Sequence, residues 1–148
     1  MSTFLDQQFP ETYKKFLAAA GTINDVAAEA GLSPELIELV MVRISQINGC
    51  PTCLSVHGPQ AREVGISQLK LDVLPAWHNA EIYSEEERAA LQLAEALNGS
   101  ERGPVDVAAR EAAAKVFNEK QIAALQWAAV TIEAFNKISI ASGHPVRK

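Results

Sequence analysis

The chain has 148 residues, 48% of them hydrophobic, and its formal charge is −5 at neutral pH. We expect one domain over residues 1–148, with a real apolar core and no signature of disorder. Arg147 and Lys148, the most basic stretch, are too few for a surface that binds nucleic acid or anionic lipid. No run approaches the ~20 apolar residues that span a bilayer, and the start shows no secretion signal, so a cytoplasmic protein without membrane or nucleic-acid partners is expected.

Helix signals follow one another along the chain, whereas alternating strand patterns are absent, so the predicted fold class is all-α. A first helix is expected from Pro10 to Ala20 and a short second one from Asn24, as its cap, to Ala30. A third opens at Ser33-Pro34, with a hydroxyl cap and proline at the first helical position, and runs to about Ile47. The first of these helices carries an apolar stripe made of Phe9, Tyr13, Phe16, Leu17 and Ala20.

The next helices have equally clear boundaries in the sequence. Asn48-Gly49 breaks the chain, and Pro51 then starts a helix that continues to Val64. Ser67 caps a short helix that is interrupted near Pro75. Ser84 and Glu87 form a capping box ahead of a helix rich in alanine and leucine.

Two further helices are predicted, over residues 105–117 and 119–142. The last one is apolar on more than one face, which favours either a central helix of the monomer or a helix covered by another subunit. We expect an oligomer partly on this ground. Four aromatic residues are assigned to the core or to a subunit interface: Trp77, Phe117, Trp127 and Phe135.

The chemistry is expected in the segment Cys50-Pro-Thr-Cys53 and at His57. If a helix starts at Pro51, Cys50 is its cap and Cys53 the third helical residue, where unpaired N–H groups and the helix dipole favour a thiolate. Spacings of three and four residues put both sulfurs and the imidazole on one helical face, with His57 in reach of the Cys53 proton. The cap position predicts that Cys50 is the more exposed cysteine.

A reaction follows from this spacing. One thiolate attacks a peroxide oxygen and becomes a sulfenic acid; the second thiol then condenses with it, releases water and leaves a Cys50–Cys53 disulfide. A reductant reopens the disulfide by thiol exchange. In a reducing compartment, two cysteines so close together indicate redox chemistry or metal binding and not a structural disulfide.

Glu38, eleven intervening residues and Cys50-x-x-Cys53-x-x-x-His57 together resemble the signature of the alkylhydroperoxidase D-like branch of the carboxymuconolactone decarboxylase superfamily. The resemblance runs from Ser33 to the end of the chain. It implies a bundle of packed helices, assembled as a trimer or hexamer. It also implies that Glu38 and His57 form a proton relay, that Cys53 meets the peroxide and that Cys50 resolves it. The best-known peroxidase of this family has a histidine between the cysteines, whereas this chain has Thr52.

The sequence therefore favours a thiol peroxidase for hydrogen peroxide or organic hydroperoxides, reduced by a lipoyl protein, a thioredoxin-like protein or a small thiol. No bound organic cofactor is expected, because no nucleotide, flavin or haem pattern is present. One alternative is a dithiol–disulfide oxidoreductase that passes electrons to a partner protein. Another is a helical regulatory module holding zinc on Cys50, Cys53 and His57, whose fourth ligand would be Glu38, His78 or His144.

Overall fold

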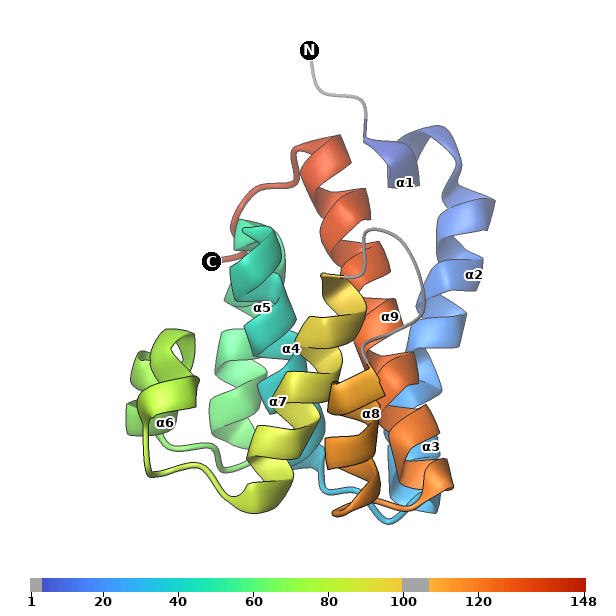
Figure 1. The fold of residues 1–148 in the computed structure, drawn as a ribbon. Helices are drawn as coiled ribbons and strands as arrows, with labels where there is room; N and C mark the ends of the chain where they lie inside the picture. Colours follow the sequence, from blue (N-terminus) through green and yellow to red (C-terminus); the bar gives the residue numbers. More distant parts are fainter. Residues whose placement is uncertain (1–3, 100–106) are drawn as a thin grey trace.

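The computed structural model describes residues 4–99 and 107–148, and all regular structure in these ranges is helical (Figure 1). The predicted all-α class is confirmed. The elements in chain order are α1 (Leu5–Gln8), α2 (Pro10–Gly21), α3 (Ile23–Glu29), α4 (Pro34–Asn48), α5 (Pro51–Glu63), α6 (Gln68–Val73), the 3₁₀ helix η1 (Leu74–Asn79), α7 (Glu85–Asn98), α8 (Val107–Ala114) and α9 (Glu119–Ser142).

Helix α4 is the central element of the bundle. The Ser33 hydroxyl accepts a hydrogen bond from the Leu36 N–H, Pro34 occupies the first turn, and Gly49 ends the helix at φ 67°, a left-handed conformation that glycine adopts without strain. The helix packs against α5, α7 and α9, and most of its residues are buried. Ile47, near the end of the helix, is 44% exposed.

Helix α9 has the predicted bounds and is held at its start by a capping box between Asn118 and Gln121. One face packs against α4 and α7 through small and aliphatic side chains such as Ala128 and Ile132. The opposite face is apolar as well but uncovered, and Trp127 on it is 60% exposed. Helix α9 thus packs within the monomer against α3, α4 and α7 and also keeps an exposed apolar strip.

Three boundaries differ from the prediction. The short helix α1 was not expected. Asn24 does not cap α3, which begins at Ile23 directly after the end of α2, so the two helices follow each other without a side-chain cap. Helix α8 ends at Ala114, earlier than expected, and residues 105–106 of the predicted helix lie outside the described residues. Within the ranges 4–99 and 107–148, no helix is long and apolar enough to cross a membrane.

Glu95 on α7 ties three elements together. Its Oε1 accepts hydrogen bonds from Arg43 Nε on α4, at 2.6 Å, and from Trp77 Nε1 on η1, at 2.7 Å, while His78 Nε2 lies 3.2 Å from Oε2. Burial acts to raise the pKa of Glu95, but the hydrogen bonds from Trp77 and Arg43 outweigh it and hold that pKa below its ordinary value. The cluster fixes η1 and α7 against the central helix.

Candidate functional site

The site is built on the start of α5, directly after the left-handed turn at Gly49. Cys50 is the N-cap residue, and its sulfur accepts a hydrogen bond from the Cys53 N–H at 3.2 Å. Pro51 follows at the first helical position, as predicted. Both sulfurs therefore lie at the end of the helix where unpaired N–H groups stabilise negative charge.

A network of amides around the buried Asn136 holds this turn in place. Asn48 Nδ2, at the end of α4, donates to Asn98 Oδ1 on α7 and to Asn136 Oδ1 on α9, each at 3.0 Å. Asn136 is fully buried and donates in turn to the Ser45 hydroxyl. Because a buried amide needs its hydrogen-bond partners, the network fixes the three helices around the residue pair Asn48-Gly49 that precedes Cys50.

Cys50 and Cys53 are joined by a disulfide, with their Cα atoms 5.4 Å apart. Cys50 is 0% exposed and Cys53 is 6% exposed. The prediction that the cap position exposes Cys50 was therefore wrong. The reason is tertiary: Cys50 belongs to the main apolar core, which α4, α7 and α9 build with residues such as Ile44, Leu93 and Ile132.

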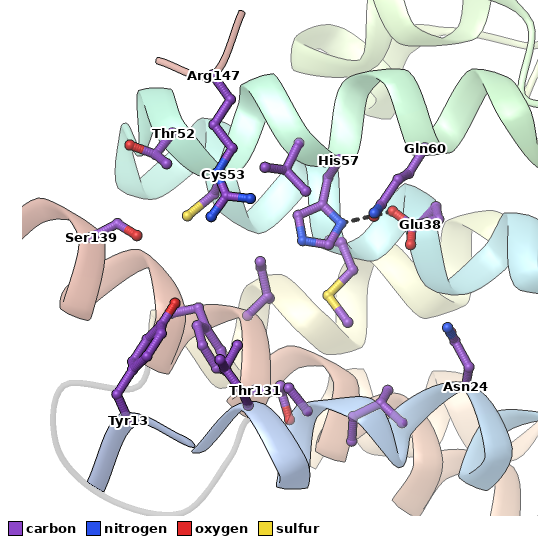
Figure 2. A pocket seen from close by; sticks show the side chains of 17 residues that line it. Tyr13, Asn24, Glu38, Thr52, Cys53, His57, Gln60, Thr131, Ser139 and Arg147 are labelled. Carbon is purple, nitrogen blue, oxygen red and sulfur yellow. Dashed lines mark hydrogen bonds and ion pairs between the residues drawn. The ribbon is translucent and has the colours of Figure 1, made fainter. Parts of the chain in front are cut away.

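Glu38 and His57 meet across the contact between α4 and α5. Oε2 of Glu38 lies 2.8 Å from Nδ1 of His57, and the two side chains are 12% and 20% exposed. When Nδ1–H donates to the carboxylate, the neutral imidazole keeps its lone pair on Nε2. Figure 2 shows that this second nitrogen points away from Glu38, into the adjoining pocket.

That pocket has a volume of about 280 Å³ and is lined by Glu38, Cys53 and His57 but not by Cys50. Its remaining walls come from α2, α3, α4, α5, α9 and the chain end (Figure 2). Most of these walls are apolar, from Leu17 and Ile23 on one side to Ile132 and Phe135 on the other. The structure thus gives one of the two sulfurs and the carboxylate–imidazole pair access to a common space large enough for a small organic molecule.

Several lining residues were missed by sequence reasoning. They are Tyr13, Asn24, Thr52, Gln60, Thr131, Ser139 and Arg147. Most lie on elements far from the cysteine motif in sequence, and no local spacing links them to it. In the sequence, Arg147 stands out only as part of a short basic tail. The number of charges in a segment does not reveal that one of them is placed in a pocket.

The two remaining histidines lie outside this site. His78 contacts Glu95, and His144 Nε2 lies 2.9 Å from Asp6 Oδ1, where a hydrogen bond from the imidazole lowers the pKa of Asp6. Among the residues that the structure describes, no group of three or more His, Cys, Asp or Glu side chains is arranged to hold a metal ion. The zinc alternative therefore has no ligand set in the described part of the chain.

Comparisons with known proteins place the chain in a family. Residues 10–96, which include Glu38, Cys50, Cys53 and His57, match the model of the carboxymuconolactone decarboxylase family. The uncharacterized protein YdfG of Bacillus subtilis (strain 168) is 37% identical over 109 residues, which cover 72% of this chain and 73% of YdfG.

Solved structures share the fold at lower identity. A protein of unknown function from Agrobacterium tumefaciens, described as a candidate antioxidant defence protein AhpD, superposes with a TM-score of 0.90 at 24% identity, over 99% of this chain and 98% of that one. The debrominase Bmp8 superposes with a TM-score of 0.75 at 21% identity, over 88% and 70% of the two chains. The fold is thus the AhpD-like one, and by sequence the chain belongs to the carboxymuconolactone decarboxylase family.

Proposed function

We propose that this protein is a thiol peroxidase that reduces hydrogen peroxide or small organic hydroperoxides through a Cys50–Cys53 dithiol–disulfide cycle. The observation that carries the proposal is the common pocket: Cys53 lines it together with the hydrogen-bonded pair Glu38–His57, while its disulfide partner Cys50 is buried behind. A nucleophilic sulfur, a proton relay and space for a substrate are the parts that such a reaction requires.

In the first step, the Cys53 thiolate attacks one oxygen of the hydroperoxide. An S–O bond forms, the O–O bond breaks, and the sulfur is oxidised to a sulfenic acid while the hydroperoxide becomes an alkoxide. His57, oriented by Glu38, first takes the thiol proton and then returns it to the alkoxide, which leaves as an alcohol. Cys53 is assigned this role because its sulfur, and not that of Cys50, borders the pocket.

In the second step, the Cys50 thiol attacks the sulfenic sulfur of Cys53. An S–S bond forms, and the hydroxyl of the sulfenic acid leaves with the thiol proton as water. The two residues stand one helical turn apart with Cα atoms 5.4 Å apart, so the disulfide closes without a rearrangement of the helices. Rapid closure also protects Cys53 from further oxidation.

A reductant completes the cycle by thiol–disulfide exchange. Because Cys50 is fully buried, the incoming thiolate attacks Cys53 from the pocket and releases Cys50, whose sulfur accepts the Cys53 N–H. A pocket of about 280 Å³ suits a small thiol or a lipoyl arm better than the flat surface of a thioredoxin-like protein. We place this cycle in the cytoplasm, where such thiols are kept reduced.

We also propose that the chain works as a homo-oligomer, either a trimer or a hexamer. Phe9, the N-cap residue of α2, and Phe16 on α2 line an apolar groove against α9 and are 68% and 46% exposed. Trp127 and Val130 on α9 are 60% and 45% exposed. Large exposed apolar side chains gathered on neighbouring helices are typical of a surface that another subunit covers.

The test is a stopped-flow titration of the fully reduced protein with hydrogen peroxide and with cumene hydroperoxide, followed by thiol counting and intact mass. Fast loss of both thiols and a product two hydrogens lighter are expected. If the reduced protein reacts with peroxide no faster than a free thiol of similar pKa, the peroxidase proposal fails. The protein would then be a dithiol–disulfide exchange protein that passes electrons to a partner.

A further inference from the structure

We propose that residues 144–148 form a strap that carries Arg147 into the pocket, where its guanidinium pairs with the Cys53 thiolate of the reduced protein. The inference rests on the proposed function, since it concerns the same sulfur. It concerns a residue outside the cysteine motif and outside the region that matches the family model, because that region ends at residue 96.

The strap is fastened to the start of α5 at two points. Gly143, at φ 68°, turns the chain back after α9, and the Thr52 hydroxyl then donates to the His144 carbonyl at 2.7 Å and lies 3.1 Å from the Pro145 carbonyl. Further on, the Arg147 N–H donates to the Ser55 hydroxyl at 3.0 Å. Both anchoring side chains belong to the first five residues of the helix that carries Cys53.

The other side of the strap is also held. His144 Nε2 lies 2.9 Å from Asp6 Oδ1, and the imidazole packs edge-on against the Phe4 ring, with ring centroids 5.0 Å apart. The strap is therefore held at His144 by residues Phe4 and Asp6 and at Arg147 by α5, and Figure 1 shows the chain end beside α5. A tail fastened on both sides presents its side chains at fixed places, unlike a free terminus.

Among the described residues that line the pocket, Arg147 carries a guanidinium group. The other titratable side chains on its walls are Tyr13 from α2, Glu38 from α4 and Cys53 and His57 from α5, whereas the lining residues of α9 do not titrate. Glu38 is already engaged by His57, and Arg147 forms no ion pair with a described carboxylate. Figure 2 shows Arg147 reaching from the chain end toward Cys53.

This arrangement leaves the guanidinium without an anionic partner as long as Cys53 is tied up in the disulfide. Reduction frees the thiol, and a cation that lines the same pocket, although itself exposed to solvent, favours the ionised form of the thiol. Arginine suits this task because it stays protonated at every relevant pH. Thr52 is a positioning residue, since its hydroxyl holds the strap that carries Arg147.

The experiment uses Cys50→Ser protein, in which Cys53 is the sole thiol, and follows its ionisation by thiolate absorbance and by the pH dependence of alkylation with iodoacetamide. Arg147→Gln is expected to raise the pKa of Cys53 by about one unit. Arg147→Lys should keep most of the wild-type value because it retains the charge. Lys148→Gln removes the neighbouring cation and should leave the pKa unchanged.

The anchor is tested in the same assay. Thr52→Val removes the hydroxyl that holds the strap and should move the pKa in the same direction as Arg147→Gln, while Thr52→Ser should restore it. Equal pKa values in Arg147→Gln and Lys148→Gln would overturn the pairing, and an unmoved pKa in Thr52→Val would overturn the anchor. Alkylation requires no peroxide, so a protein that lacks peroxidase activity but shows these shifts would refute the proposed function and leave the role of Arg147 standing.

Discussion

The carboxylate of Glu38 lies 2.8 Å from Nδ1 of His57, although 19 residues separate the two in sequence. The contact exists because α4 and α5 pack side by side after the tight turn at Gly49. It holds the ring so that its second nitrogen faces the pocket that Cys53 lines. The pair is thus placed to move a proton between the sulfur and a molecule bound in that pocket.

This contact predicts a non-additive pair of substitutions. Glu38→Gln and His57→Ala should each lower the rate constant for reaction with peroxide by about a hundredfold. The double variant should be hardly slower than either single one, because both remove the same relay. Glu35→Gln, an exposed carboxylate on the same helix, is the matched control and should react like the wild type. Multiplicative losses in stopped-flow rates would show that the two residues act separately.

Because Cys50 is fully buried and Cys53 lines the pocket, substitutions of the two cysteines should affect the reaction with peroxide differently. Cys53→Ser should lose all reaction with peroxide, because the remaining sulfur does not border the pocket. Cys50→Ser should consume one equivalent of peroxide and stop at a sulfenic acid, since no thiol is left to resolve it. Intact mass after dimedone trapping distinguishes the two. A dimedone adduct on Cys50 in Cys53→Ser would reverse the assignment.

The Glu95 cluster predicts how stability depends on pH. Its folded-state pKa lies below the unfolded value, so the ionised carboxylate stabilises the protein above the unfolded pKa, and this stability is lost as pH falls through the folded pKa. Glu95→Gln should lower the free energy of unfolding at neutral pH by about 1–3 kcal/mol and flatten its dependence on acid.

Urea unfolding followed between neutral and acidic pH checks this expectation. Glu29→Gln is the control: its pKa is lowered by a hydrogen bond from Lys120, but that pair is exposed and should contribute almost nothing to stability. If Glu95→Gln and the wild type lose stability in parallel as the pH falls, Glu95 is not the group that couples stability to acid.

The exposed apolar face of α9 predicts self-association. Sedimentation velocity of the wild type should give three or six times the mass of the chain. Trp127→Glu should shift the distribution toward the monomer, because a carboxylate would then have to be buried in the interface. Lys15→Glu places the same new charge on an exposed polar position of α2 and should leave the assembly intact. A monomeric wild type would contradict the proposed oligomer.

Many helix boundaries could be predicted from the sequence because helix ends depend on hydrogen bonds between residues three or four positions apart. Ser33 and Ser84 cap the helices they were expected to cap, and Gly49 ends α4 in the left-handed conformation. The cysteine pair at the start of α5 follows from the same local logic, since Pro51 marks the first helical residue. The resemblance to the family signature already implied that Glu38 and His57 form a proton relay.

The burial of Cys50, the walls of the pocket and the place of Arg147 were decided only by the tertiary structure. Each depends on which surfaces meet when α2, α9 and the chain end pack around α5, and these segments lie 30 or more residues from the motif. Helical periodicity states which residues share a face, but not which face is covered. The same local pattern therefore predicted an exposed Cys50, and the packing of α4, α7 and α9 into one apolar core made it the buried one.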